Sequence, residues 1–305
     1  MNVTSSTARA STAAAVASPG SADDTLPARV RLGSAGSNAR RRRRRNLIRS
    51  DHEPPSWEVR ALSPLAIIAV WQSVSVIGWL PQDVLAPPSR VLSTLGSLIS
   101  DGTLTTALSV SVQRARFGFA LGSLIALGAA LPVGLTRTGE AIIDPPMQML
   151  RTLPLLGLVP LFIVWFGIGE APKILLVALG VCVPLYLNAV GALRSIDPDL
   201  YELADALDLT AWQRFRHVII PGALPGTLVG VRQALAFAWL ALIVAEQMSA
   251  TAGLGFMINN ARDFMQTDTI VVGLLTYAAL GLITDAAVRV AERRALRWRT
   301  EGTSR

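Results

Sequence analysis

The sequence is short of the residue types that build most catalytic and metal sites. Its 305 residues include one cysteine, Cys182, and two histidines, His52 and His217, which lie far apart in the chain. One cysteine excludes an intramolecular disulfide, and two distant histidines argue against a histidine-based metal site. We therefore expect no catalytic group and no metal, and we interpret Cys182, inside an apolar block, as a small buried hydrophobe.

Lysine and nucleotide-binding motifs are equally scarce. The only lysine is Lys173, in the segment EAPKILL. A phosphate-binding loop of the form GxxxxGK[ST] is absent, so the chain cannot bind ATP in that way, and we expect no cofactor in it. The sequence also has no HEXXH pair and no convincing Ser–His or metal set, which disfavours an intramembrane enzyme.

Long apolar runs make up most of what is present. The chain is 51% hydrophobic and only 16% charged, with a mean hydropathy of +0.45. This composition is typical of a polytopic membrane protein. About six runs have the roughly 20 residues that a helix needs to cross a bilayer, so we predict an all-α membrane protein with about six transmembrane helices. The runs are Leu62–Leu80, Phe117–Leu135, Met147–Phe166, Ile174–Leu193, Thr227–Met248 and Ile270–Val290.

Glycine and proline occur inside these runs. Gly118 and Gly122 form a GxxxG pair, a pattern typical of close helix packing in membranes. The third run contains Pro154 and Pro160. We expect that span to tolerate them, because neighbouring helices satisfy the carbonyl groups that proline frees.

Arginine is distributed unevenly around the runs, and cytoplasmic loops are the ones that carry an excess of Lys and Arg. With the N-terminus inside, the outer loops carry only Arg90, Lys173 and Arg262, plus Arg114 at the mouth of the second run. We therefore expect a multi-pass cell-membrane protein with both termini in the cytoplasm. The arginines that this orientation places on the inner side are Arg40–Arg45, Arg49, Arg60, Arg137, Arg194, Arg214, Arg216, Arg293, Arg294, Arg297 and Arg299.

The two ends of the chain differ from its middle. Residues 1–60 are rich in Ala, Ser, Thr and Arg, and we interpret them as a disordered cytoplasmic tail. Its run Arg40–Arg45 suits anionic lipid beside a span better than it suits nucleic acid. We expect the membrane domain to cover residues 61–295 and a short cytoplasmic tail to cover residues 296–305.

The longest polar passage between apolar runs covers residues 199–226 and reads DLYELADALDLTAWQRFRHVIIPGALPG. A first helix is predicted over Leu200–Leu207, where Glu202 and Asp205 suit the positive end of the helix dipole. Asp208 interrupts the pattern.

A second short helix is predicted to follow. Thr210 and Gln213 have the spacing of a capping box, which starts a helix. We expect Pro221 and Pro225 to end it. The passage thus predicts a rigid helix–turn–helix between two spans, suited to docking on a partner.

This passage resembles the EAA loop of ABC-importer permeases, which lies in the cytoplasm and docks on the ATPase subunit. The acid of that pattern corresponds to Glu202, and its glycine position is occupied by Asp208, which tolerates positive φ better than most residues, at some cost. The Ile-x-Leu-Pro of the pattern falls on residues 218–221. The residues that the resemblance assigns to ATPase coupling are Glu202, Leu203, Ala204, Asp205, Asp208, Leu209 and Pro221.

The resemblance extends over most of the chain, from about Trp71 to Trp298. The segments MQMLRTLPLLGLVPLFIVWFGIGEAPKI and HVIIPGALPGTLVGVRQALAFAWLALIVAEQMSATAGLGFMINNARDFMQTD are similar to permeases of the nitrate, taurine and aliphatic-sulfonate importer group, and most similar to the aliphatic-sulfonate members. This implies a type I ABC-importer (MetI-like) fold, a second copy of the chain, a cytoplasmic ATPase dimer that uses ATP, and an extracytoplasmic solute-binding protein. Taurine, nitrate and thiamine precursors remain alternative cargoes.

A sulfonate would need cationic or N–H donors along its path. Arg151 and Arg232, near the inner ends of the third and fifth runs, are candidates because ionisable residues inside spans are functional candidates by default. Asn188 and Gln233 offer neutral donors. Alternatively, both arginines extend to lipid headgroups or pair with acids.

Other charged residues near the outer side suggest a gate. Glu246 is expected to cap a neighbouring element or to form a gate by pairing with Arg262, and Asp285 is expected to pair with Arg289 one turn on. The segment Gly253–Phe256 is interpreted either as a tight loop near the docking face of the binding protein or as a plain turn.

An ion-driven secondary transporter is the rival hypothesis from another class. It would need acids at the membrane centre or unwound helices at matching positions of two repeats. The sequence has no clear internal repeat, which favours the ATP-driven importer.

Overall fold

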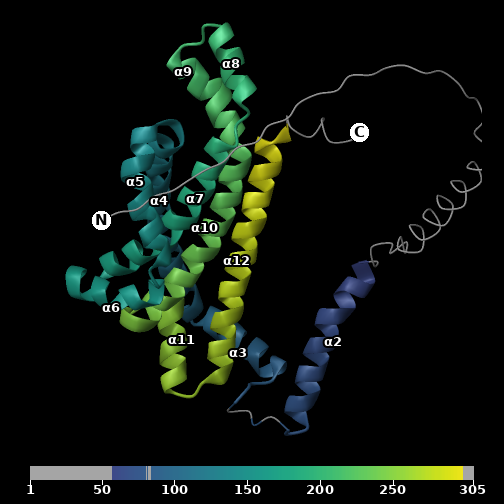
Figure 1. The fold of residues 1–305 in the computed structure, drawn as a ribbon. Helices are drawn as coiled ribbons and strands as arrows, with labels where there is room; N and C mark the ends of the chain where they lie inside the picture. Colours follow the sequence, from purple (N-terminus) through teal and green to yellow (C-terminus); the bar gives the residue numbers. More distant parts are fainter. Residues whose placement is uncertain (1–56, 80, 82–83, 298–305) are drawn as a thin grey trace, which may run out of the picture. The chain divides into compact units, whose positions relative to one another are not determined.

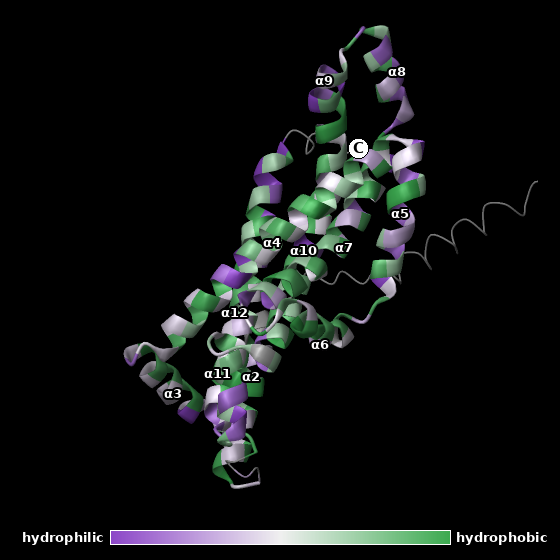
Figure 2. Ribbon diagram, turned by 90° about the vertical axis from the view of Figure 1, so that its left-hand side faces the viewer, coloured by the Kyte–Doolittle hydropathy of each residue, from purple (hydrophilic) through white to green (hydrophobic). Residues whose placement is uncertain are grey.

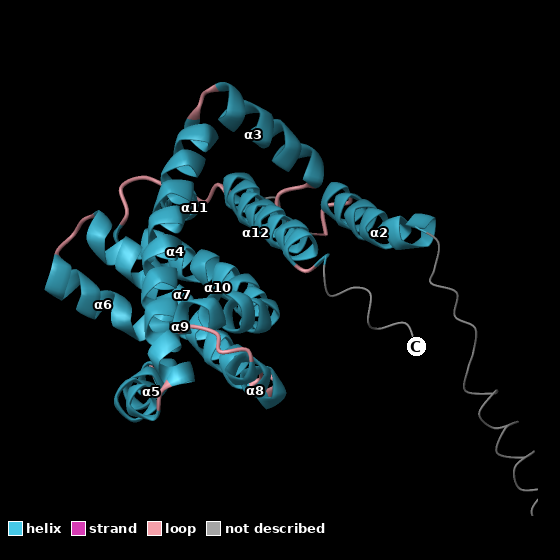
Figure 3. Cartoon of the chain, turned by 90° about the horizontal axis from the view of Figure 1, so that it is seen from above, coloured by secondary structure: helices cyan, strands magenta, loops and turns pink. Residues whose placement is uncertain are grey.

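The computed structural model describes residues 57–79, 81 and 84–297. In that part of the chain the elements are helices joined by loops, without strands (Figure 3), so the predicted all-α class is confirmed. The helices are α2 (Trp57–Val76), α3 (Pro88–Ser100), α4 (Thr103–Leu135), α5 (Arg137–Thr152), α6 (Leu155–Phe166), α7 (Glu170–Arg194), α8 (Pro198–Ala206), α9 (Ala211–Arg214), the π-helical turn η1 (Phe215–Ile219), α10 (Ile220–Ser249), α11 (Leu254–Asp263) and α12 (Thr267–Ala295).

The bundle belongs to the second of two compact units, residues 62–305, the first being residues 1–61. The tails predicted over residues 1–60, with Arg40–Arg45, and over residues 296–305 lie almost wholly outside the described residues.

Four described helices are long and apolar enough to cross a bilayer, or up to five if a bent pair counts as one span. They are α4, α7, α12 and the continuous helix Ala211–Met248, which confirm the second, fourth, sixth and fifth predicted spans. The first predicted span, Leu62–Leu80, corresponds to a shorter apolar helix, Leu62–Val76.

The third predicted span is wrong as a single helix. The segment Met147–Phe166 is divided between α5 and α6, which are bent by 114° relative to each other. Leu153 and Pro154 adopt extended backbone, with ψ of 130° and 111°. Proline has no N–H and disfavours the helical region for the residue before it, so Pro154 ends the helix at Thr152.

Helix α7 forms the centre of the bundle and packs most extensively against α4 on one side and α10 on the other (Figure 3). Its residues Val181, Leu185 and Tyr186 are completely buried. Gly118 and Gly122 face α7 so closely that a Cβ built on Gly118 would lie 2.5 Å from Val177. The close packing that the GxxxG pair predicted is confirmed.

The helix that follows the polar passage does not stop at its prolines. The chain is helical from Ala211 to Met248 in one span, with Pro221 and Pro225 inside it, so the prediction that they end the helix is wrong. The turn η1 explains the continuity, because Ile220 N donates to Phe215 O five residues back. A π turn inserts an extra residue and thereby accommodates the missing N–H of the nearby proline.

Polar and apolar residues are segregated along the bundle of residues 62–305 (Figure 2). Helices α8 and α9 carry hydrophilic residues at one end, and α3 and α11 lie toward the other end (Figure 1). The middle of the bundle is predominantly hydrophobic, as a protein surrounded by lipid requires.

The contact between α4 and α7 can be tested with two glycines of α4. Gly122→Ala would place a Cβ 2.4 Å from Ala178 O and is expected to destabilise the bundle by about 1–3 kcal/mol. Gly128→Ala, which meets nothing within 4 Å, is expected to be neutral or slightly stabilising. Thermal unfolding of the purified variants in detergent measures both, and equal unfolding temperatures would contradict close packing at Gly122.

Candidate functional sites

The passage of residues 199–226 begins with a compact helix–turn–helix at one end of the bundle (Figure 1). Its first helix, α8, starts at Pro198, two residues before the predicted start, and the side chain of Asp197 caps it by accepting from Asp199 N at 3.1 Å. Thr210 and Gln213 form the predicted capping box at the start of α9. The first predicted helix is thus confirmed, and so is the start of the second, which continues into a span instead of ending at Pro221.

The turn between the two helices centres on Asp208, which has a φ of 49°. The positive φ expected at this glycine-like position is therefore present with aspartate. Leu209 N donates to Ala204 O at 3.1 Å, which closes the turn onto α8. An ion pair between Asp205 and Arg214 ties α8 to the helix that follows. These contacts hold the two helices at a fixed angle.

One side of this helix pair is anchored and the other is exposed. Ala204 is 1% exposed, and the ring of Phe215 packs on a small apolar cluster at the base of the pair. Glu202 and Leu209 lie at the surface or partly exposed, and Leu203, Leu207 and Trp212 expose more than half of their surface. The apolar cluster beneath Phe215 consists of Ala192, Leu193, Ile196, Ile219 and Ala223.

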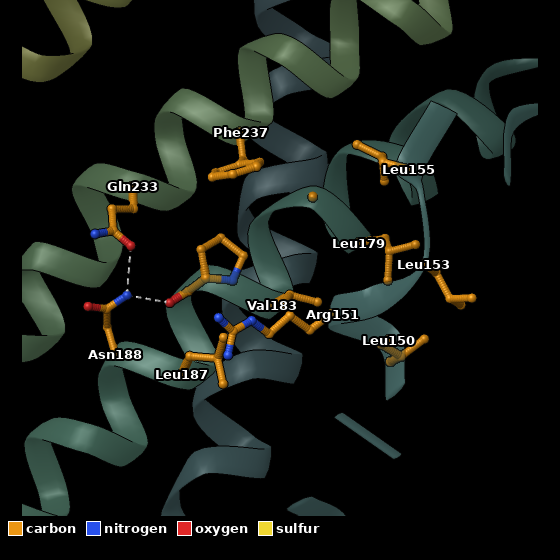
Figure 4. Close-up of a pocket in the computed structure, with 12 residues that line it drawn as sticks. Leu150, Arg151, Leu153, Leu155, Leu179, Val183, Leu187, Asn188, Gln233 and Phe237 are labelled. Carbon is orange, nitrogen blue, oxygen red and sulfur yellow. Dashed lines mark hydrogen bonds between the residues drawn. The ribbon is translucent and has the colours of Figure 1, made fainter. Parts of the chain in front are cut away.

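A second feature is a cavity of about 410 Å³ between the end of α5, the middle of α7 and α10 (Figure 4). Three of the four residues predicted for a substrate path, Arg151, Asn188 and Gln233, line this cavity. Asn188 Nδ2 donates to Gln233 Oε1 at 2.9 Å and to Pro184 O at 2.7 Å. The other lining side chains are almost all apolar.

The fourth predicted residue, Arg232, does not line that cavity. Its guanidinium lies 2.5 Å from Glu292 and 3.3 Å from Asp285. Asp285 also pairs with Arg289, as predicted. Arg232 therefore connects α10 to α12, which agrees with the alternative that it pairs with acids.

A third feature, which we call the buried ionic cluster, consists of Ser111 and Arg114 of α4, Glu170 and Lys173 of α7, and Glu246 of α10. Glu246 is 1% exposed and its carboxylate lies 2.7 Å from Arg114 Nη1 and 2.8 Å from the Ser111 hydroxyl. Arg114 binds Glu170 with two further bonds of 2.5 and 2.7 Å. Lys173 Nζ lies 3.1 Å from the same carboxylate.

The cluster also fixes the start of α11. Glu246 accepts from Gly255 N at 2.8 Å and from the Tyr277 hydroxyl at 2.9 Å. Glu246 therefore caps α11, where its negative charge suits the helix N-terminus. The role as a cap that the sequence suggested agrees with this geometry.

The proposed pairing of Glu246 with Arg262 is wrong. Arg262 is 67% exposed and lies 3.6 Å from Asp263, whereas Glu246 binds Arg114. The segment Gly253–Phe256 is the start of α11 beside this cluster, with Gly253 at a φ of 113°. A Cβ on Gly253 would lie 2.5 Å from Glu246 Oε1, so a side chain there would displace the carboxylate.

Sequence reasoning missed Arg114 as the partner of Glu246, because the two lie 132 positions apart. The available signal was that an arginine and a glutamate each occur near the outer end of an apolar run. A charge buried there needs an opposite charge nearby, since an unpaired one is very costly in lipid.

The ion pair of Arg114 and Glu246 predicts strong coupling between these two residues. Arg114→Met and Glu246→Leu are each expected to cost about 3–5 kcal/mol, because each leaves the other charge buried without that partner. The double variant is expected to lose less than the sum. Thermal unfolding in detergent measures the cycle, with Arg262→Met as a nearly neutral control; additive losses would show that the pair is not coupled.

Comparison with known proteins places the chain in a family. Residues 118–297 match the model of the binding-protein-dependent transport system inner membrane component. The chain is 46% identical to a putative aliphatic sulfonates transport permease of Escherichia coli, over 77% of this chain and 89% of that one. The corresponding protein of Bacillus subtilis is 42% identical over 80% and 88%, and the taurine transport permease of Escherichia coli is 32% identical over 77% and 87%.

Solved structures give the same fold. A chain of an amino acid ABC transporter with histidines superposes with a TM-score of 0.55 at 18% identity, covering 66% of this chain and 97% of that one. The predicted type I ABC-importer architecture is thereby confirmed. The chain belongs to the binding-protein-dependent transport system inner membrane components, and it is a membrane permease subunit of an ABC importer rather than an enzyme.

Proposed function

We propose that the chain translocates aliphatic sulfonates across the cytoplasmic membrane. The observation that carries this proposal is the similarity to two aliphatic-sulfonate permeases from different bacteria, at 46% and 42% identity, against 32% for the taurine permease. Taurine, nitrate and thiamine precursors are the alternative cargoes within the group.

The proposed assembly contains two copies of this permease, a cytoplasmic ABC ATPase dimer and an extracytoplasmic solute-binding protein. The ATPase uses the ATP, and the permease itself needs no cofactor. Nucleic acid is not among the proposed partners. The exposed side of α8 and α9 is the surface that we assign to the ATPase, because Leu203, Leu207 and Trp212 expose apolar area there beside the acid Glu202.

The positions of the arginines support the proposed orientation. Arg194 ends α7 at the same end of the bundle as α8, and Arg214 lies in α9 itself. Lys173 and Arg262, which the sequence assigns to the outer side, belong to the start of α7 and to α11, toward the other end. Because cytoplasmic segments carry the excess of Lys and Arg, we place α8, α9 and both termini in the cytoplasm.

The continuity of the helix Ala211–Met248 supports the proposed coupling mechanism. When ATP closes the ATPase dimer, a force applied to α8 and α9 reaches the span through this helix without an intervening flexible loop. The ion pair of Asp205 with Arg214 and the buried Ala204 keep α8 on the same rigid body. The spans then tilt, and the opening moves from the inside to the outside; hydrolysis resets the inward-facing state.

The proposed docking surface predicts which variants lose coupling. Glu202→Lys is expected to weaken ATPase binding by reversing a surface charge, and Ala204→Pro by breaking α8 in its interior. Each should lower ATP-driven uptake at least tenfold while the permease still inserts into the membrane. Co-purification of the ATPase measures the contact, and Asp263→Lys, on α11, is the control. Normal uptake by both variants would contradict the coupling role.

The proposed cargo and energy source are tested together in vesicles. Membranes that contain the permease and its ATPase, supplied with the binding protein, should accumulate a labelled alkanesulfonate only when ATP is present on the ATPase side. An imposed proton or sodium gradient without ATP should give no accumulation. Accumulation driven by the gradient alone would establish the secondary transporter, and ATP-driven accumulation of taurine or nitrate in preference to alkanesulfonates would reassign the cargo.

A further inference from the structure

The cavity between α5, α7 and α10 has the charge and size of a site for a small organic anion. Its volume of about 410 Å³ falls within the range of roughly 300–1,000 Å³ that small-molecule sites occupy. Arg151 is the one charged residue among its lining residues, and those residues include no carboxylate. The cavity therefore has a net positive charge.

The arginine at this cavity has no acid beside it, unlike Arg114 and Arg232, the two arginines that link membrane-spanning helices. Arg114 and Arg232 each bind two carboxylates. No carboxylate among the described residues lies within ion-pair distance of Arg151. Arg151 is exposed, so its guanidinium is not bound within the protein and can accept an anionic ligand in the cavity.

The break between α5 and α6 places this arginine. Arg151 lies in the last turn of α5, two residues before the extended Leu153, and its side chain reaches toward Leu187 of α7 (Figure 4). In a straight third span, the helix would continue past Arg151. The bend instead brings it against the middle of α7, where Pro184 and Asn188 lie.

Two carboxamides complete the polar part of the lining. Asn188 Nδ2 donates to both Pro184 O and Gln233 Oε1, which fixes the pair. The amide nitrogen of Gln233 has no hydrogen-bond partner among the described residues and remains available as a donor. A guanidinium fork with a neutral N–H donor is the combination that suits an oxyanion with three oxygens.

The remaining walls are apolar. Leu155, Leu179, Val183, Leu187 and Phe237 line the cavity, and Figure 4 shows Phe237 on the α10 side and Leu155 on the α6 side. This surface suits an alkyl chain. It does not suit an ammonium group, because a buried cation without a partner carboxylate is strongly destabilised.

We propose that this cavity is a transit site for alkanesulfonates, with the sulfonate at Arg151 and Gln233 and the alkyl chain against Phe237 and the leucines. This inference rests on the proposed function. It further assigns selectivity to the permease: a sulfonate with an apolar tail is accepted, and a zwitterionic aminosulfonate such as taurine is disfavoured, because the lining has no carboxylate to pair with its ammonium group. A single guanidinium and a partly open cavity give weak binding, as a site from which the cargo must leave requires.

The site is tested by equilibrium binding to the permease–ATPase complex in lipid nanodiscs without the binding protein, so that the selectivity of that protein does not enter. Labelled butanesulfonate is the probe, and unlabelled butanesulfonate and taurine are the competitors. Arg151→Gln should weaken butanesulfonate binding about tenfold or more, and Arg151→Lys should restore part of it. Arg137→Gln, at the other end of α5, should bind like the wild type.

A second variant tests the selectivity. Gln233→Glu keeps the shape of the side chain and adds the missing carboxylate, so it should weaken butanesulfonate and strengthen taurine as a competitor. Unchanged affinities in Arg151→Gln and Gln233→Glu, with intact ATPase co-purification, would overturn the site. If wild-type complex with its binding protein still imports alkanesulfonates with ATP, the proposed function survives that result; if it imports none, the proposed function itself fails.

Discussion

The close approach of α7 to α4 and α10 is the constraint on which the rest of this bundle depends. In lipid there is little hydrophobic driving force between helices, so packing at short distance through small residues holds spans together. Gly122 of α4 would clash with Ala178 if it carried a Cβ, and Gly226 of α10 would clash with Ala192. Helix α7 packs against both neighbours, and it lines the cavity and contributes Glu170 and Lys173 to the buried ionic cluster.

The buried ionic cluster and the cavity at Arg151 differ in how their charges are balanced. At the buried ionic cluster, Glu246 receives hydrogen bonds from three side chains and one backbone N–H, so its charge is fully compensated within the protein. At the cavity, Arg151 has no acidic neighbour among the described residues. The paired charges link the helices that carry them, whereas the exposed guanidinium of Arg151 has no carboxylate partner and can bind an anion.

The proposed role of the helix pair α8–α9 is to transmit movement from the ATPase to this bundle. Its residues are exposed toward a partner, yet its base is packed on Ala192 and Ile219, and its second helix continues into a span. The π turn at Phe215–Ile219 allows the chain to remain helical past Pro221. A helix resists compression and bending better than a loop does, so movement at one end is transmitted to the other.

The sequence by itself determined the features that depend on local pattern: the apolar runs, the capping box at Thr210 and Gln213, the turn at Asp208 and the resemblance of its surroundings to an importer loop. It also brought together Arg151, Asn188 and Gln233 as candidates on chemical grounds, although Arg232 lies elsewhere. Only the tertiary structure decided that Met147–Phe166 bends by 114° and that Glu246 pairs with Arg114. The physical reason is that local patterns act between residues a turn apart, whereas the partner of a buried charge and the path of a broken helix are selected by distant helices that pack against them.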